Sequence, residues 1–333
     1  MSFNFSIENN SSQWKNYTFY SYYSYVDYFM NLLIVNVTFA VAGTLINVWF
    51  LAAMLLDRKI RSRMRNKIIC GLLVVNLTET VILCGLDIID SSAVLLEANQ
   101  FHCNVYAVYE TIYHTQDFVG NWYLVILLCV FTTRSMKFEP RFTPRWKNIL
   151  TSVIFISPCV FALFFVPLTM NRYYSRFHDA ICLSASKAKL IYICLDTIVP
   201  QTLAVLLLMI ASAFKRRRYF QGPASDALRD QLIDDRSQID PWYPFVALLV
   251  TAIATDIFKV VYFINPRVFY MLEHWTMNRL FLVFQVVTYL RLVVVPLVIL
   301  LFPDIREQIK TWRPCRRSVP PTDLVVTYEK NTS

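Results

Sequence analysis

The stretch YFMNLLIVNVTFAVAGTLINVWFLAAMLL, from Tyr28 to Leu56, is predominantly apolar and decides the class of fold. A helix needs about 20 apolar residues to cross roughly 30 Å of hydrocarbon. This stretch meets that requirement, and six further stretches along the chain meet it as well. They are Ile68–Leu86, Asn104–Thr133, Ile149–Met170, Leu190–Phe214, Tyr243–Ile264 and Leu280–Phe302. The sequence therefore predicts a membrane protein with seven crossings.

The seven crossings are predicted to be helices of one all-α bundle. Backbone N–H and C=O groups find no water inside a bilayer, so a crossing is either a helix or a strand of a closed barrel. Barrel strands alternate apolar with polar residues, whereas these stretches are continuously apolar. Hydrophobic residues make up 56% of the 333 residues and charged residues 17%, which agrees with a membrane domain. We expect a seven-helix domain over 28–302, a tail over 1–27 and a final segment over 303–333.

Lys and Arg residues crowd on alternate sides of the predicted bundle. They follow the first, third, fifth and seventh helices and are sparser in the other loops. The residues concerned are Arg58, Lys59, Arg61, Arg63, Arg65, Lys67, Arg134, Lys137, Arg141, Arg145, Lys147, Lys215 to Arg218, Arg306, Lys310, Arg313, Arg316 and Arg317. By the positive-inside rule, these segments are predicted to be cytoplasmic and the N-terminus extracellular, as expected of a multi-pass protein of the plasma membrane.

The net charge of +9 lies largely in these juxtamembrane segments. There it meets the anionic membrane lipid of the inner leaflet, which attracts basic side chains. No nucleic-acid partner is therefore expected.

Three sequons agree with an extracellular N-terminus. Asn4, Asn10 and Asn16 each begin an Asn-x-Ser/Thr motif within the short tail. Glycosylation at these asparagines requires the tail to lie outside the cell. We predict that all three are glycosylated.

Two of the eight cysteines are predicted to face the extracellular side. Cys103 stands at the outer end of the third helix, and Cys182 stands in the loop between the fourth and fifth helices. A disulfide persists in that oxidising compartment and would pin the loop over the mouth of the bundle. We expect a Cys103–Cys182 bridge, with two free thiols as the alternative.

The chain resembles the rhodopsin-like G-protein-coupled receptors over roughly Tyr28 to Cys315. The first helix carries GTLIN, in which Asn47 matches the asparagine of the family's Gly-Asn signature. The third helix ends in FTTRSMKFEP, with Arg134 in the place of the family's cytoplasmic arginine, and the fifth helix holds Pro200. The segments NWYLVILLCVFTTRSMKFEP and DTIVPQTLAVLLLMI are most similar to FMRFamide-peptide receptors and nematode class W serpentine chemoreceptors. The resemblance implies an extracellular peptide or small-molecule ligand and a heterotrimeric G protein as partners.

The switch motifs of that family are altered in this chain. Thr133 stands before Arg134 where the family has an acid, and Pro296 follows a valine where the family has asparagine. Asn76 lies nearest to the place of the family's second-helix aspartate. Because Thr133 cannot form the family's ion pair with Arg134, we expect a less tightly locked resting state. The residues that the resemblance assigns to the switch are Thr133, Arg134, Asn47, Asn76 and Pro296.

One face of the third helix carries four polar residues in its outer half. Glu110, His114, Asp117 and Asn121 follow one another at helical spacing, where an extracellular ligand would arrive. Charged groups inside a bilayer cost roughly 2.5–3.5 kcal/mol each, so they face the interior of the bundle and find partners. We expect a ligand cavity between the third, fifth, sixth and seventh helices. Its predicted ligand-binding residues are Glu110, Tyr113, His114, Asp117, Asn121, Lys259 and Arg291.

Lys259 on the sixth helix and Arg291 on the seventh are the expected counter-charges of the acids. The acids concerned are Glu110, Asp117, Asp196 and Asp256. A purely structural role is the alternative, in which these charges pair with one another and hold the helices in register. His114 has no His or Cys partner at metal-ligand spacing, so neither a metal site nor a cofactor is predicted.

The segment after the seventh helix is predicted to form a short amphipathic helix. Pro303 can begin it, because the missing proline N–H is not needed in the first turn. Its apolar face consists of Ile305, Ile309 and Trp312, opposite Arg306, Lys310 and Arg313. The helix is therefore expected to lie along the inner leaflet. Cys315, next to two arginines, is a predicted palmitoylation site.

Other classes of function are less well supported by the sequence. The Gly-x-Ser-Gly and Gly-x-Gly-Asp motifs of intramembrane proteases do not occur, so no enzyme is expected. A transporter or channel, or a ligand-binding protein that does not signal, is the alternative. The presence of only five glycines argues against the broken helices of transporters.

Overall fold

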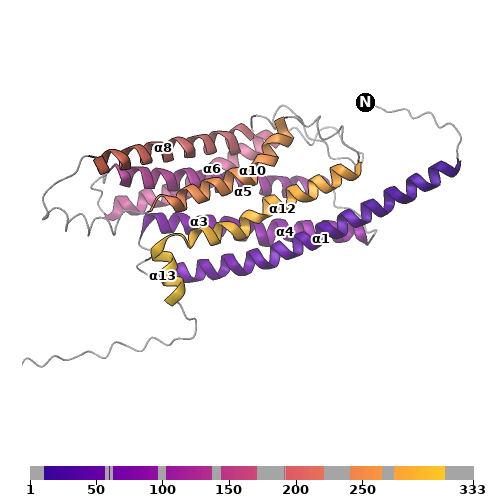
Figure 1. The fold of residues 1–333 in the computed structure, drawn as a ribbon, viewed down its shortest axis with the longest axis horizontal. Helices are drawn as coiled ribbons and strands as arrows, with labels where there is room; N and C mark the ends of the chain where they lie inside the picture. Colours follow the sequence, from indigo (N-terminus) through magenta and orange to yellow (C-terminus); the bar gives the residue numbers. More distant parts are fainter. Residues whose placement is uncertain are drawn as a thin grey trace, which may run out of the picture.

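The computed structural model describes residues 11–56, 60, 63–96, 103–136, 144–170, 191, 193–220, 241–264 and 274–311. Every secondary-structure element in these ranges is helical, and the helices form an elongated bundle (Figure 1). In chain order they are α1 (Ser11–Leu56), α3 (Met64–Thr78), η1 (Glu79–Leu83), α4 (Cys84–Leu95), α5 (Cys103–Ser135), α6 (Pro144–Met170), η2 (Cys194–Ile198), α8 (Val199–Phe220), α10 (Tyr243–Ile264), α12 (His274–Ile299) and α13 (Pro303–Thr311). The predicted all-helical class is confirmed for the described residues.

Six segments within the described ranges are long and apolar enough to cross a membrane. They are Val26–Leu56, Met64–Ala93, Thr111–Ser135, Cys194–Phe214, Tyr243–Tyr262 and Thr276–Ile299. Each coincides with one of the predicted stretches. The predicted stretch that remains is α6, which is 27 residues long and has a shorter described apolar part, Ser152–Phe164.

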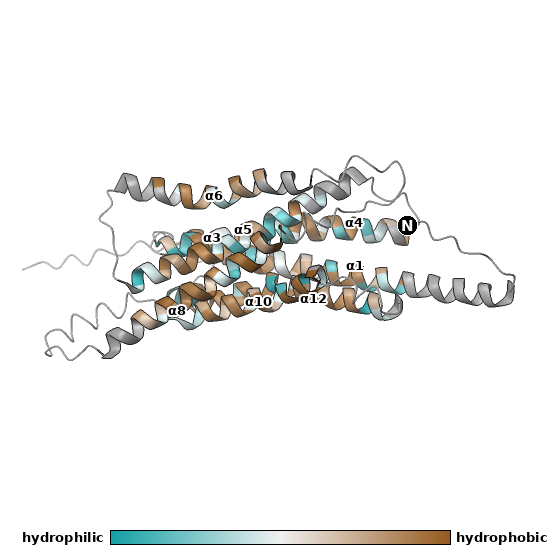
Figure 2. Ribbon diagram, turned by 90° about the horizontal axis from the view of Figure 1, so that it is seen from above, coloured by the Kyte–Doolittle hydropathy of each residue, from teal (hydrophilic) through white to brown (hydrophobic). Residues whose placement is uncertain are grey.

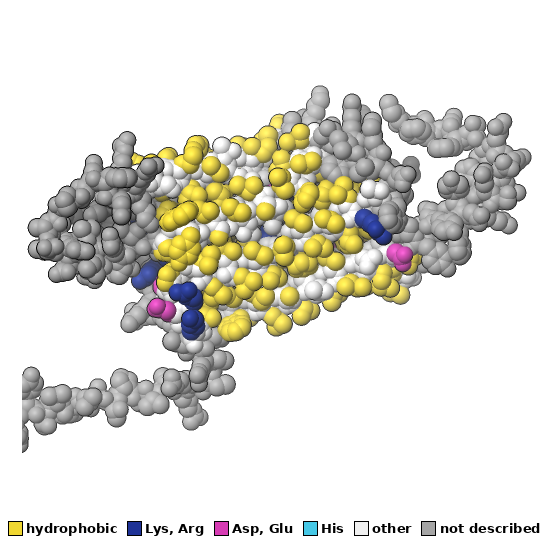
Figure 3. All heavy atoms as spheres, viewed as in Figure 1, with side chains coloured by type: hydrophobic (Ala, Val, Ile, Leu, Met, Phe, Trp, Pro, Cys, Tyr) yellow, Lys and Arg dark blue, Asp and Glu magenta, His cyan; other side chains and the backbone are white. Residues whose placement is uncertain are grey.

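The outer surface of the bundle is apolar and its interior is partly polar. Large hydrophobic side chains such as Leu45 and Leu163 are exposed, while Asp117 and Asp256 are buried. In Figure 3, hydrophobic side chains cover the middle of the molecule, and the charged side chains in view lie towards its two ends. This arrangement suits a protein surrounded by hydrocarbon.

The centre of the bundle is α5. Of the six membrane-length segments, the one in α5 is the most buried, with 61% of the residues in its most apolar part inside the bundle. It contacts α3, α6, α8 and α10, and Figure 2 shows α6 along one edge of the bundle. Polar side chains on α5 therefore have neighbours on several sides.

Two of the crossings contain a π-helical turn. Within the second crossing, η1 separates α3 from α4 and begins at Glu79. Within the fifth predicted crossing, η2 precedes α8 and contains Asp196. A π turn inserts one extra residue into a helix and is frequent at functional sites. Both turns place a buried carboxylate in the interior of the bundle.

Asn47 satisfies the backbone of α12 where Pro296 interrupts it. A proline inside a helix cannot donate to the carbonyl four residues earlier, which here belongs to Leu292. The Asn47 Nδ2 atom donates to that carbonyl oxygen over 2.8 Å. Gly43 permits this close approach, because a Cβ atom on it would lie 3.4 Å from Leu292 Cβ and would overlap Thr80 Cγ2. Asn47 and Pro296, both predicted switch residues, therefore belong to one contact between α1 and α12.

The short helix α13 begins at Pro303, as predicted. Asp304 accepts hydrogen bonds from Arg63 over 3.1 Å and from Arg65, which is almost fully buried. These ion pairs hold the start of α13 against the start of α3. Ile305 is buried in the core of the bundle, so part of the apolar face that the sequence assigned to the inner leaflet contacts protein.

We predict that Asn47→Ala lowers stability by about 1–3 kcal/mol, because the buried Leu292 carbonyl then lacks a donor. In a Pro296→Ala background the same substitution should cost clearly less, since the N–H of residue 296 can now reach that carbonyl. Melting temperatures of the four purified proteins in one detergent measure the difference. Asn31→Ala is the control, because Asn31 is exposed and bonds only the Asp27 carbonyl of its own helix among the contacts described. Equal losses in both backgrounds would contradict the assignment.

Candidate functional site

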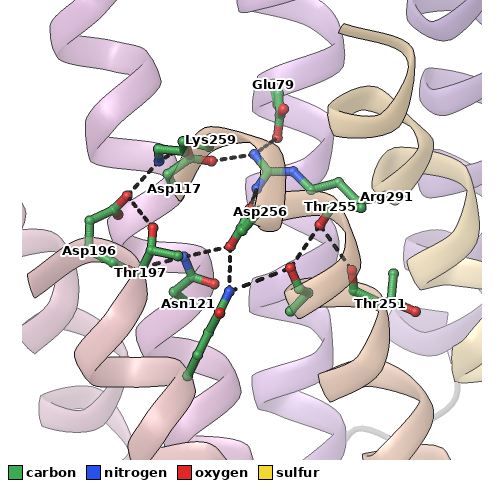
Figure 4. Close-up of polar contacts among 12 residues, drawn as sticks. Glu79, Asp117, Asn121, Asp196, Thr197, Thr251, Thr255, Asp256, Lys259 and Arg291 are labelled. Carbon is green, nitrogen blue, oxygen red and sulfur yellow. Dashed lines mark hydrogen bonds and ion pairs between the residues drawn. The ribbon is translucent and has the colours of Figure 1, made fainter. Parts of the chain in front are cut away.

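Six charged side chains meet in the interior of the bundle and form the interior ion cluster (Figure 4). They come from the second, third, fifth, sixth and seventh predicted crossings. The members are Glu79, Asp117, Asp196, Asp256, Lys259 and Arg291. The four carboxylate side chains are at most 4% exposed, so these charges are shielded from solvent and lipid alike.

Lys259 joins α10 to the two helices that carry Asp117 and Asp196. Its Nζ atom lies 2.6 Å from Asp117 Oδ2 and 2.6 Å from Asp196 Oδ2. The same ammonium group stands 5.4 Å from the centre of the Tyr113 ring, which is within cation–π range. Tyr113 precedes Asp117 by about one turn of α5, so its ring lies on the predicted outer side of this ion pair.

Arg291 makes the corresponding connection from α12. One terminal nitrogen lies 2.7 Å from Glu79 Oε2 and 2.5 Å from Asp117 Oδ1. Its other terminal nitrogen lies 3.9 Å from Asp256 Oδ1. The planar guanidinium can serve several carboxylates at once, which an ammonium group does less well.

Asp117 is the carboxylate that both basic residues share. Its Oδ2 atom accepts from Lys259 and its Oδ1 atom accepts from Arg291. The side chain of one residue on the central helix α5 is therefore bonded to both α10 and α12.

Asp256 is held mainly by neutral side chains. Its Oδ2 atom accepts a hydrogen bond from Gln201 over 2.8 Å and one from Asn121 over 3.3 Å. The same Asn121 amide nitrogen donates over 3.0 Å to the backbone carbonyl of Asp196. That carbonyl lies four residues before Pro200, which cannot donate to it. Asn121 thus donates to the carbonyl that Pro200 leaves without a backbone donor, as Asn47 does for the carbonyl that Pro296 leaves without one.

A small cavity adjoins the cluster on the side towards α13. Its volume is about 60 Å³, enough for a few water molecules. Its walls come from α3, α5, α10 and α12, and they include Asn76, Asn121, Asp256 and Arg291. The predicted ligand cavity was assigned to the third, fifth, sixth and seventh helices, so this cavity shares only part of that lining.

The structure brings most of the predicted ligand-binding residues together. Asp117, Asn121, Lys259 and Arg291 belong to the cluster or bond to it, and Tyr113 packs over Lys259. His114 is buried, and its ring centre lies 5.4 Å from that of Tyr113. The side chain of Glu110 lies outside the described residues.

The predicted switch residues are spread along the bundle. Thr133 is exposed near the end of α5 and donates to the Val130 carbonyl of its own helix over 3.0 Å. Arg134 follows it in the last turn and is partly buried. Asn76 is buried in α3 on the wall of the small cavity.

Several predicted modification sites lie outside the description of the structure. Asn4, Asn10, Cys182 and Cys315 are outside the described residues, and the side chains of Asn16 and Cys103 are not described. Glycosylation, palmitoylation and the Cys103–Cys182 disulfide therefore stay predictions. The five cysteines that are described, Cys70, Cys84, Cys129, Cys159 and Cys194, are free thiols.

Glu79 is not among the site residues predicted from the sequence. Asn76 is the predicted second-helix counterpart of the family's acid, but the charge that reaches Arg291 is three residues further along. A usable signal existed, because Glu79 is the only charged residue in the stretch Ile68–Leu86 and a lone intramembrane charge requires a partner.

Comparison with known proteins adds no family assignment. No family model matches the sequence, and no curated protein matches it either.

We predict that Lys259→Met destabilises the protein strongly, by about 3–5 kcal/mol, because two buried carboxylates lose a bonded base. Adding Asp196→Asn should recover part of that loss, since one of the uncompensated charges is then removed. Melting temperatures of wild type, the two single variants and the double variant give the coupling free energy between Lys259 and Asp196, expected at about 0.5–3 kcal/mol. Ile257→Met is the matched control, because this α10 residue is 50% exposed. Strictly additive losses would contradict the Lys259–Asp196 pairing.

Proposed function

We propose that this chain is a seven-helix plasma-membrane receptor that binds an extracellular peptide or small molecule and signals to a heterotrimeric G protein. The observation that carries the proposal is the interior ion cluster, in which bases on α10 and α12 share the carboxylate of Asp117 on α5. A buried cluster of this kind favours discrete arrangements, because a helix that moves must exchange charged partners rather than lose them. It is therefore suited to a two-state switch.

In this proposal α6 also crosses the membrane, as the fourth crossing in chain order, and raises the number of crossings from six to seven. Its 27 residues correspond to a length of about 40 Å at 1.5 Å per residue, which exceeds the roughly 30 Å of hydrocarbon. Exposed side chains such as Phe161 and Phe164 along its described part support a lipid-facing position. An odd number of crossings places the two termini on opposite sides of the membrane, as the distribution of basic residues predicts.

The ligand would act from the predicted extracellular side on Lys259. Tyr113 lies one turn outward of Asp117 and covers the Lys259 ammonium group. A ligand with a carboxylate or carbonyl oxygen could compete with Asp117 and Asp196 for that group. Such a ligand shifts the equilibrium between the resting and the rearranged cluster to the extent that it binds the rearranged cluster more tightly than the resting one.

The response would appear at the predicted cytoplasmic ends of α5 and α10. There the Phe131 and Phe245 rings stack with their centres 4.2 Å apart, close in sequence to Arg134. Nearer the other end of α10, the Phe258 ring stacks on the Phe284 ring of α12 with their centres 4.7 Å apart. This contact favours a pivot for α10 at that end. Movement of α10 about this pivot would separate Phe131 from Phe245 and open a surface beside Arg134 for the G protein.

A second candidate function is proton-coupled transport. The cluster contains four carboxyl groups and two basic groups, and an excess of intramembrane acids is typical of proton pathways. In that case the protein would carry a solute across the membrane and would activate no G protein.

We predict that Lys259→Met raises ligand-independent G-protein activation several-fold, because α10 then loses its ion pairs with Asp117 on α5 and Asp196 in η2. Adding Arg134→Ala should return the signal to the background of cells without the protein. Dissociation of the G-protein heterotrimer in living cells is the measurement, normalised to the amount of protein at the cell surface.

Ile257→Met is again the control and should leave the signal at the wild-type level. The receptor proposal fails if surface-expressed Lys259→Met and wild-type proteins activate none of the G-protein classes tested. Proton-coupled solute flux in the same cells would then support the transporter.

A further inference from the structure

A second and larger cavity opens on the outer surface of the bundle. This cavity, the lateral groove, has a volume of about 640 Å³ and lies between α1, α3, α5 and α6. Its walls are mostly apolar and include Leu51, Val74, Val119 and Phe155. The volume falls within the range of about 300–1,000 Å³ that is usual for small-molecule sites.

The side chain of Gln116, in the wall of the groove, has no hydrogen-bond partner in the part of the chain that the structure describes. Gln116 is 7% exposed, and neither its Oε1 nor its Nε2 atom has a hydrogen-bond partner among the described residues. The two threonines near it donate to carbonyls of their own helices, Thr115 to Thr111 over 2.7 Å and Thr78 to Val74 over 2.8 Å. An amide buried in this way calls for a group that both donates and accepts a hydrogen bond.

Gln116 also separates the groove from the interior. Together with Val75 it lines both the lateral groove and the small cavity beside the ion cluster. A polar group bound to Gln116 from the groove would therefore stand next to the cavity that Asp256 and Arg291 line.

The groove has a basic residue at its other end. Lys67 lies in the first turn of α3 and lines the groove, and no described residue is an ion-pair partner of its ammonium group. The packing of α3 on α5 sets the distance between Lys67 and Gln116. A Cβ atom on Gly71 would lie 3.1 Å from Tyr123 Cε2, and one on Gly120 would lie 3.7 Å from Val75 Cγ1.

This register places Gln116, one turn beyond Gly120, near the level of Thr78. Lys67 and Thr78 are separated by about 16 Å along the helix axis, at 1.5 Å per residue. That length is about half of the roughly 30 Å hydrocarbon thickness, so the groove extends from the membrane boundary to about the middle of the bilayer.

We propose that the lateral groove binds a single-chain lipid acid that carries a hydroxyl group near the far end of its chain. The carboxylate pairs with Lys67 at the membrane boundary, and the chain lies along Val74 and Phe155. The hydroxyl group donates to Gln116 Oε1 and accepts from Gln116 Nε2. An ordinary acyl chain fills the same apolar space but leaves the amide unsatisfied. This site is independent of the proposed receptor function.

Equilibrium binding to the full chain in phosphatidylcholine nanodiscs tests the proposal, with radiolabelled ω-hydroxymyristic acid and myristic acid as probes. The hydroxy acid should bind the wild-type protein about tenfold more tightly than myristic acid, the ratio expected for satisfying a buried amide. Gln116→Leu should reduce that ratio to about one. Lys67→Met should weaken both acids by a similar factor and keep the ratio between them.

Two further variants locate the site. Val74→Phe narrows the groove and should weaken the binding of both probes. The variant should still fold, because Val74 is 47% exposed. Leu297→Phe makes the same kind of change on the exposed face of α12 and should have no effect. If Gln116→Leu does not fold, photolabelling of the wild-type protein with a diazirine derivative of the hydroxy acid replaces it, with adducts expected on α3, α5 or α6. Equal affinities of the two acids for the wild-type protein, unchanged binding in Val74→Phe, or adducts confined to other helices would overturn the proposal.

Discussion

The Asp117 carboxylate accepts from Lys259 on α10 with one oxygen and from Arg291 on α12 with the other. Inside hydrocarbon there is little hydrophobic drive for helices to associate, so close packing and interhelical polar bonds must hold them together. Asp117 is the group on α5 on which both bonds depend, and α5 is the most buried crossing. If its charge is lost, two bases and their remaining acids must find a new arrangement.

Irregular backbone in this bundle occurs next to buried polar side chains. The two π turns carry Glu79 and Asp196, the outlying acids of the cluster. The carbonyls that Pro200 and Pro296 leave without a donor are bonded by Asn121 and Asn47. At these two proline sites the freed carbonyl is therefore bonded by an amide from a neighbouring helix, as the absence of water in a bilayer requires.

Much of this arrangement can be predicted from the sequence, because the rules involved need no detailed geometry. Apolar length predicts the crossings, and the cost of an intramembrane charge predicts that Lys259 and Arg291 face acids such as Asp117. Which acid meets which base depends on how each helix is rotated. The π turn at Glu79 changes that rotation in a way that residue spacing does not reveal, and spacing from Asn47 in the family pattern indicates Asn76 instead. The lateral groove was missed for a similar reason, since Gln116 lies on α5 next to the predicted polar face and its lack of a partner is visible only once α3 and α6 are in place.

The central claim is that the interior ion cluster holds α10 against α5. Nitroxide labels introduced as non-natural amino acids at Thr133 and Trp242 report the distance between the corresponding ends of these helices by pulsed electron paramagnetic resonance. We expect one narrow distance distribution in the wild-type protein and a broader distribution centred at a longer distance in Lys259→Met. An unchanged distribution in a folded Lys259→Met protein would contradict it.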